Sequence, residues 1–341
     1  MNYNLQRLRA SAAIAVLLFH CVPFFERAGG SLGFLKPLIA CGYAGVDLFF
    51  VLSGFIIAKG VSARHYDWTA ASRFLEKRAY RIFLGYWPVL GLTVVFYMAT
   101  MPERVTQVSA MTNLLLLSNR IPELVIGQAW SLSYELFFYV SFGLLALAGR
   151  RSLRSLVMGY VAVILIANLV NPELAELFVL SPFLLELFAG AVLGSVSTQH
   201  WPRIEVWVLA VAAILLLALW IAIEMRTPLM RAFVVGGAAF SLVASAELLR
   251  LRGVNGVSTL SRLGDSSYSL YLIHYQLLEA FSIFVMPVAG LKPYLPAIFC
   301  VWVGMIIGVS HLFHRVVEKP LYDFVCEFRR LGSASQTARA L

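Results

Sequence analysis

Long apolar runs, separated by short polar turns, recur along almost the whole chain. Ten of them approach the roughly 20 residues that an α-helix needs to cross the hydrocarbon core of a bilayer. Only helices and closed barrels satisfy all their backbone hydrogen bonds in lipid, so the pattern predicts an all-α polytopic integral membrane protein with about ten transmembrane helices. The runs cover residues 8–27, 38–59, 84–101, 129–148, 155–171, 177–197, 204–224, 228–248, 264–288 and 294–316.

The composition supports this interpretation. Of the 341 residues, 60% are hydrophobic and 13% are charged, against roughly 45–50% and 25% in soluble domains. The longest polar stretches, residues 60–83 and the tail after 317, are loop-sized, so we expect no separate soluble domain. Residues 60–83 should hold a short interfacial helix with basic and apolar faces. Residues 331–341 should form a short, disordered cytoplasmic tail.

The net charge of +9 is distributed as a membrane requires. If the N-terminus is cytoplasmic, 20 of the 27 lysine and arginine residues fall on inner segments and seven on outer segments. The positive-inside rule therefore predicts that both the N- and C-termini are cytoplasmic. This distribution accounts for the basic charge, so we do not expect a nucleic acid as a partner.

The four cysteines do not indicate a disulfide framework. Cys21, Cys41 and Cys300 lie in the proposed spans, and Cys326 lies in the cytoplasmic tail. No cysteine or histidine spacing typical of a metal site is visible, so we expect no metal.

Five ionisable residues fall at a similar depth in the proposed spans. His20 lies about 16 Å along its helix from Arg9 and on the same helix face. Measured from the cytoplasmic helix ends, all five members of the layer lie at roughly 15–20 Å. The layer consists of His20, Asp47, Glu135, Glu186 and His274.

Such a layer has more than one interpretation. Ionisable groups within a membrane are costly and are usually functional, although a lone histidine can also simply hydrogen-bond to a neighbouring helix. The layer fits a proton or ion relay in a transporter, or a general acid–base site for group transfer. A scaffold whose polar layer only fixes helix register is a third hypothesis. Transporters commonly carry repeats with broken helices in matching positions, and the sequence shows none.

A basic cluster before the third span offers a second signal. Lys77, Arg78 and Arg81 can serve as topogenic charge and attract anionic lipid. Alternatively, Arg78 and Arg81 lie three residues apart on one helix face, and guanidinium groups suit phosphate oxygens. The sequence alone leaves both interpretations open.

Six motifs in order resemble the acyltransferase-3 family of membrane O-acyltransferases. Each is weak alone, but the series covers most of the chain. The motifs are Leu5-Gln6-Arg7-Leu8-Arg9 with His20, Gly45-Val46-Asp47-Leu48-Phe49-Phe50-Val51-Leu52-Ser53-Gly54-Phe55, Phe74-Leu75-Glu76-Lys77-Arg78-Ala79-Tyr80-Arg81-Ile82, Trp130-Ser131-Leu132 with Glu135, Tyr268-Ser269-Leu270-Tyr271-Leu272 with His274, and Glu318-Lys319-Pro320.

The resemblance implies a single acyltransferase domain over residues 1–330 in the inner (plasma) membrane. It implies cytoplasmic acyl-coenzyme A, with acetyl-coenzyme A the first expectation, as the donor. The acceptor would be a hydroxyl of a cell-surface or exported glycan, or of a lipid-linked oligosaccharide. It further implies that Arg9, Arg78 and Arg81 bind the donor and that His20 is catalytic. Membrane lipids and a second copy of the chain are compatible partners.

On this basis His20, oriented by Asp47 or Glu135, would take the proton from the attacking hydroxyl. Ser53, Tyr271 or His274 would contact the substrate or the developing oxyanion. The sequence does not choose between direct transfer and an acyl-His20 intermediate. A proton-coupled transporter or flippase of glycan precursors remains the alternative function.

Overall fold

The computed structural model of the protein describes residues 2–61, 67–147, 150–196, 205–223 and 227–328. These ranges are helical and contain no strand, which confirms the all-α fold class. The expected tail 331–341 lies outside the described residues. The α-helices are α1 (Tyr3–Arg27), α2 (Lys36–Ala40), α3 (Ala44–Val61), α4 (Trp68–Thr100), α5 (Glu103–Thr106), α6 (Ala110–Leu115), α7 (Trp130–Leu147), α8 (Arg150–Val170), α9 (Phe183–Ser195), α10 (Val206–Ala222), α11 (Pro228–Leu251), α12 (Thr259–Asp265), α13 (Ser267–Ala280) and α14 (Leu295–Phe313).

Each of the ten predicted runs overlaps a helix of the structure. Three apolar helices, 155–170, 183–195 and 206–222, are shorter than a full span, and the count of ten crossings stays a prediction. Length and composition nevertheless support a multi-pass membrane protein. Among the described residues, six helical segments are long and apolar enough to cross a membrane: Tyr3–Arg27, Gly33–Gly60, Trp68–Thr100, Gly127–Leu147, Pro228–Leu251 and Ala289–Phe328.

The sequence pattern predicts a short interfacial helix in the basic segment before the third span. The structure corrects this, because the segment is not a separate helix. It forms the first part of α4, a single helix of 33 residues. The Asp67 side chain caps the start of this helix, and no proline interrupts it before Pro88. At 1.5 Å per residue α4 is about 50 Å long, well beyond a hydrocarbon core of about 30 Å. Arg78 and Arg81 therefore stand on a continuous rigid helix.

The predicted run 264–288 is divided in the structure. α12 ends at Asp265, α13 begins at Ser267, and a π-helical turn over Phe281–Val285 follows α13. Gly264 lies against the α1 backbone so closely that a Cβ atom there would collide with the carbonyl oxygen of Gln6. This contact brings α12 and the start of α13 onto α1, which carries His20.

Helix α3 lies at the centre of the packing, in contact with α1, α9 and α11. Gly45 faces α1, where a Cβ atom would collide with the carbonyl oxygen of Ala12. Gly54 faces α9, where a Cβ atom would collide with the carbonyl oxygen of Leu187. Small residues allow such close approach, which provides much of the helix association energy in lipid. The two contacts fix α3 between its neighbours.

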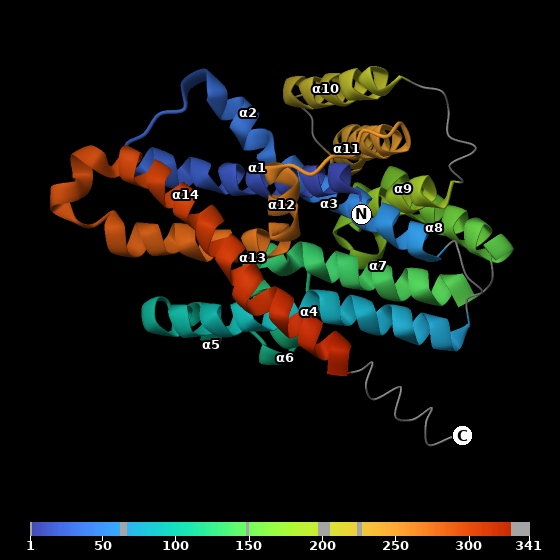
Figure 1. Cartoon of the computed structure of the whole chain (residues 1–341), viewed down its shortest axis with the longest axis horizontal. Helices are drawn as coiled ribbons and strands as arrows, with labels where there is room; N and C mark the ends of the chain where they lie inside the picture. The colour runs from blue at the N-terminus through green and yellow to red at the C-terminus, as the bar shows by residue number, and fades with distance from the viewer. Residues whose placement is uncertain (1, 62–66, 148–149, 197–204, 224–226, 329–341) are drawn as a thin grey trace.

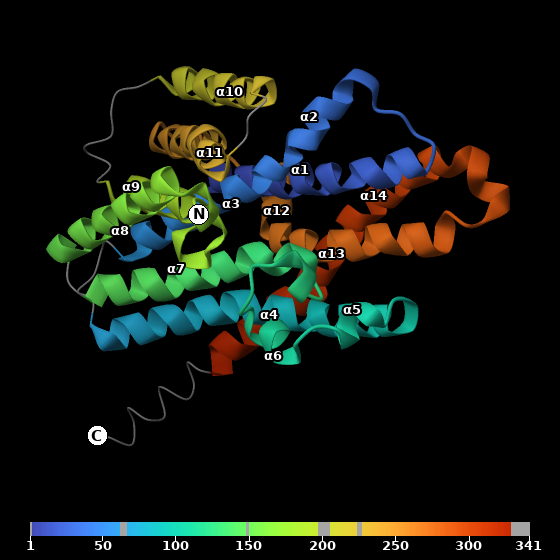
Figure 2. The same cartoon turned by 180° about the vertical axis from the view of Figure 1, so that it is seen from behind.

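The remaining helices surround this centre (Figures 1 and 2). α10 packs on α11, α4 packs on α7, and α14 crosses α13 obliquely. The outer faces are apolar; in α10 only Ala213 and Trp220 are buried. An apolar exterior of this kind suits contact with lipid chains.

We predict that Gly54→Ala lowers the stability of the protein by about 1–3 kcal/mol, because the added methyl group overpacks the α3–α9 contact. Thermal unfolding in detergent, followed by size-exclusion fluorescence, measures the change. Gly91→Ala is the matched control, since a Cβ atom at Gly91 meets open space and alanine favours a helix. Equal melting temperatures for the two variants would contradict the assigned packing.

Candidate functional site

Two cavities approach each other between the helices. The larger, of about 1250 Å³, is lined by His20 and by residues of the segments 103–128 and 172–183. The smaller, of about 140 Å³, is lined by the three arginines that the sequence singled out. Tyr271 lines both, so the cavities adjoin this residue. We call them the outer and inner cavities, after the sides of the membrane that the charge distribution predicts for them.

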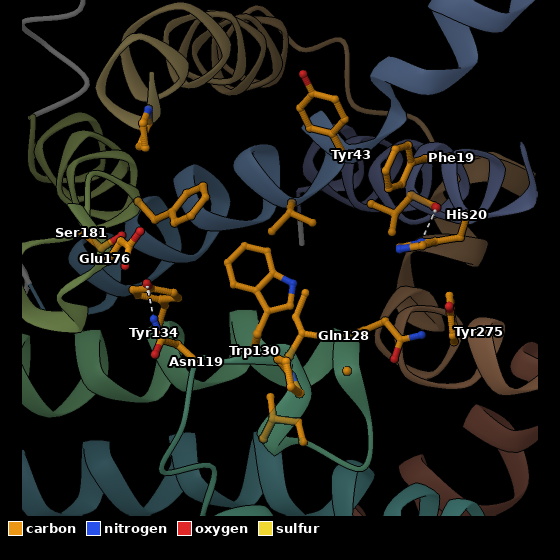
Figure 3. A pocket seen from close by; sticks show the side chains of 18 of the residues that line it. Phe19, His20, Tyr43, Asn119, Gln128, Trp130, Tyr134, Glu176, Ser181 and Tyr275 are labelled. Carbon is orange, nitrogen blue, oxygen red and sulfur yellow. Dashed lines mark hydrogen bonds between the residues drawn. The ribbon is translucent and has the colours of Figure 1, made fainter. Parts of the chain in front are cut away.

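His20 and His274 form a direct pair at the wall of the outer cavity. Nε2 of His274 lies 3.0 Å from Nδ1 of His20, and their ring centroids are 5.0 Å apart. His20 stands on α1 and His274 on α13, the two helices that pack together. Figure 3 shows the His20 ring among the residues of this cavity. Two members of the predicted layer are therefore in contact.

The backbone acceptors around the pair determine which nitrogens carry hydrogen. Nδ1 of His274 lies 3.0 Å from the carbonyl oxygen of Leu270, and Nδ1 of His20 lies 3.0 Å from that of Val16. A carbonyl oxygen only accepts, so both Nδ1 atoms are protonated in the neutral rings. His20 Nδ1–H is then shared with Nε2 of His274. The Nε2 lone pair of His20 has no partner among the described residues and is available as a base.

Asp47 does not contact His20, contrary to one of the two orientations that the sequence allowed. Its carboxylate is fully buried and accepts two hydrogen bonds from Arg231, at 2.9 and 2.8 Å. The guanidinium of Arg231 also lies over the rings of Tyr43 and Phe183, at 4.7 and 4.9 Å. Asp47 therefore neutralises a cation that α11 brings to the wall of the outer cavity.

Glu135 lies at the inner cavity, so the structure does not pair it with His20 either. It accepts hydrogen bonds from the hydroxyls of Ser53 and Tyr139. The hydroxyl hydrogen of Ser53 is thus already engaged. Glu186, the remaining member of the predicted layer, is buried on α9.

The three arginines, which the family resemblance implies bind one donor, line the inner cavity together. Arg9 has no hydrogen-bonding or ion-pair partner among the described residues. Within the described ranges Arg78 has only cation–π contacts, 5.5 Å to the Phe74 ring and 5.6 Å to the Tyr139 ring. Arg81 is 3.4 Å from Glu318, a long contact. Three guanidinium groups around one small cavity therefore hold many unused donors, as a phosphate-binding site requires.

Tyr271 lines both cavities. Its hydroxyl donates to the backbone carbonyl oxygen of Gln128 at 2.8 Å and lies 2.8 Å from Oγ of Ser131. Its hydrogen is engaged, as is that of Ser53, so neither hydroxyl is free to meet an oxyanion in this arrangement. The part of the chain that the structure describes contains no group of three or more metal-ligating side chains.

Two cavity residues were missed by the sequence analysis. Arg231 was counted as an outer topogenic charge, although its position inside the run 228–248 marked it as an intramembrane ion in need of a partner. Gln128 precedes the Trp130 motif in a turn, and no sequence signal distinguished it from an ordinary polar residue.

We predict that Arg231→Met lowers the stability by about 3–5 kcal/mol, because it leaves the buried Asp47 carboxylate uncompensated. The double variant Asp47→Asn/Arg231→Met removes both charges and should recover at least half of that loss. Thermal unfolding of the three proteins in the same detergent measures both effects. A double variant no more stable than the single one would show that the pair is not coupled.

Comparisons with known proteins agree with this site. A family model described as an acyltransferase domain matches residues 2–313. The exopolysaccharide production protein ExoZ of Rhizobium meliloti (strain 1021) is 30% identical over 304 residues, which cover 82% of this chain and 89% of that protein. No solved structure matches. The chain therefore belongs to the acyltransferase-3 family and is a membrane acyltransferase.

Proposed function

We propose that this protein transfers an acyl group, most simply acetyl, from cytoplasmic acyl-coenzyme A to a hydroxyl of a cell-surface or exported glycan. The observation that carries the proposal is the pair of cavities that share Tyr271 in their walls, one lined by arginines and the other by His20. A charged donor and a sugar acceptor can then approach one point from opposite sides. The similarity to a protein of exopolysaccharide production supports a polysaccharide as the acceptor.

The arginines that line the inner cavity suit the anionic part of the donor. Arg9, Arg78 and Arg81 would bind the phosphates of coenzyme A, since guanidinium forks pair with phosphate oxygens. The donor, when bound, supplies an acyl carbonyl activated as a thioester. Only the narrow arm that carries the thioester has to pass between the helices. The size of the inner cavity, about 140 Å³, agrees with an arm and not a whole nucleotide.

His20 would act as the general base. Its unpartnered Nε2 takes the hydroxyl proton as the hydroxyl oxygen attacks the carbonyl carbon, and the proton then passes to the departing thiolate sulfur. His274 acts as a positioning residue, because its Nε2 accepts from His20 Nδ1–H and fixes the ring and its tautomer. The same lone pair could accept the acyl group itself, so direct transfer and an acyl-His20 intermediate are both compatible with this geometry.

Asp47 and Glu135 receive supporting roles in this proposal. Asp47 holds Arg231 at the outer cavity. Glu135 moderates the positive charge of the inner cavity and holds Ser53. Ser53 and Tyr271 would contact the substrate only after exchanging their present hydrogen-bonding partners.

We further propose ten spans in the plasma membrane with both termini cytoplasmic, on the support of the 20-to-7 charge distribution. A green fluorescent protein fused to the C-terminus should fluoresce, because this reporter folds in the cytoplasm, and alkaline phosphatase fused there should be inactive. Alkaline phosphatase inserted in the segment 102–128 should be active and serves as the positive control. The opposite pattern would refute the topology.

We predict that His20→Ala lowers kcat by about 10²–10⁴-fold through the loss of the general base, with an unchanged KM for acyl-coenzyme A. Arg78→Ala should instead raise that KM by about tenfold or more, because a charge-assisted phosphate contact contributes roughly 1.5–3 kcal/mol. The assay uses the full-length protein in lipid nanodiscs, radiolabelled acetyl-coenzyme A and de-esterified oligosaccharides from the host polysaccharide. Mass spectrometry identifies the ester formed.

Arg73→Ala is the matched control for the donor site. Arg73 stands on the same helix as Arg78, is exposed and lines neither cavity. Replacing Arg73 removes one positive charge without removing a phosphate contact. The KM of this variant for acyl-coenzyme A should therefore equal that of the wild type. An equal rise in this KM for Arg73→Ala and Arg78→Ala would indicate that general surface charge attracts the donor, without a specific contact at Arg78. Near-normal transfer by His20→Ala would exclude the imidazole as the base.

A further inference from the structure

Gln128 is a buried wall residue of the outer cavity that the mechanism above does not use. It lies in the turn Gly127–Ala129 directly before α7, and its backbone carbonyl oxygen accepts from Tyr271. The backbone is therefore held at the junction of the two cavities. In the view of Figure 3 the Gln128 side chain lies between Trp130 and Tyr275. The ring of Tyr275 in turn lies 5.4 Å from that of His20.

The side-chain amide of Gln128 is unsatisfied. The residue is only 6% exposed, and neither Oε1 nor Nε2 has a hydrogen-bond partner in the part of the chain that the structure describes. Buried polar groups in proteins are nearly always hydrogen-bonded, and an unmade bond is costly. A structural residue at this place could be apolar without that cost. The free donors and acceptor therefore indicate a ligand that supplies both an acceptor and a donor.

The surroundings of Gln128 favour a sugar. Trp130, two residues further on, also lines the cavity, together with Tyr275 and other aromatic rings. Aromatic side chains combine an apolar face with polar edges, which matches the apolar faces and hydroxyl rim of a pyranose ring. The cavity volume of about 1250 Å³ exceeds the roughly 300–1,000 Å³ of small-molecule sites. It therefore has room for more than one sugar unit.

We infer, on the basis of the proposed function, that Gln128 selects the acceptor by binding two neighbouring hydroxyls of the sugar ring that becomes acylated. Its Nε2–H donates to one hydroxyl oxygen, and its Oε1 accepts from the other hydroxyl. A carboxamide makes such paired contacts readily, as it does with adjacent donor and acceptor groups of adenine. The amide thereby orients the ring for attack of the hydroxyl that faces His20.

The variant Gln128→Met tests this inference, because it keeps the side-chain length and removes both polar atoms. We expect the KM for the de-esterified oligosaccharide to rise at least tenfold, with the KM for acyl-coenzyme A unchanged. The melting temperature should be equal or higher, since an unpaired buried amide is lost. Gln276→Met is the matched control, since Gln276 is likewise buried but lines neither cavity, and the kinetic constants of this variant should not change.

A second measurement tests the paired hydroxyls directly. Periodate oxidation opens sugar rings that carry neighbouring hydroxyls, and oligosaccharide treated in this way should not compete with the intact acceptor. Equal competition by both forms would refute the paired contact. An unchanged oligosaccharide KM in Gln128→Met would refute acceptor binding by Gln128, as would a fall in kcat alone, which would place the amide at the reacting carbonyl.

These results are distinguishable from a failure of the proposed function. If the wild-type protein acylates the oligosaccharide and Gln128→Met has the same KM, only the role of Gln128 is refuted. If the wild-type protein transfers no acyl group to any host oligosaccharide, the proposed function falls, and the role of Gln128 falls with it.

Discussion

The arrangement of the site depends on how closely α3 approaches α1 and α9. Lipid chains are as apolar as the helix surfaces, so association relies on close backbone packing. Gly45 allows the close approach of α3 to α1, and Gly54 allows its close approach to α9. Between them, Asp47 meets Arg231 of α11, and Ser53 meets Glu135 of α7. One tightly packed helix therefore helps to form the walls of both cavities, and a shift of α3 would change both.

Charged side chains within the bundle are of two kinds, those paired with an opposite charge and those that line a cavity. Asp47 and Arg231 satisfy each other in an ion pair whose carboxylate is fully buried, as the cost of an ion in lipid requires. Among the described residues Arg9 and Arg78 have no acidic partner at ion-pair distance, and they line a cavity instead. A cation paired with its own carboxylate is structural, whereas cations without such a pair favour a ligand that supplies negative charge. This contrast separates the supporting charges from those assigned to the donor.

The two cavities are also compatible with the proposed transfer across the membrane. Because His20 lines the outer cavity and the arginines line the inner one, neither a glycan acceptor nor the nucleotide of the donor would have to cross the bilayer. Under this proposal only the acyl group would pass the level of Tyr271, which lines both cavities. His274 would orient the base, and Gln128 would orient the acceptor. Each of these roles requires a fixed neighbour, and α13 and the turn before α7 supply it.

The sequence by itself determined the helices, the membrane class and the family, because these depend on apolar run length and on motifs read along the chain. It also singled out His20 and the arginines as candidate site residues, since an ion in lipid or a basic cluster is visible without a structure. The sequence could not determine which side chains pair with one another. Helical periodicity gives the depth of a residue along its own helix, but not which neighbouring helix its side chain contacts. Hence only the tertiary packing decided that His20 pairs with His274, that Asp47 pairs with Arg231, and that Gln128 is left without a partner.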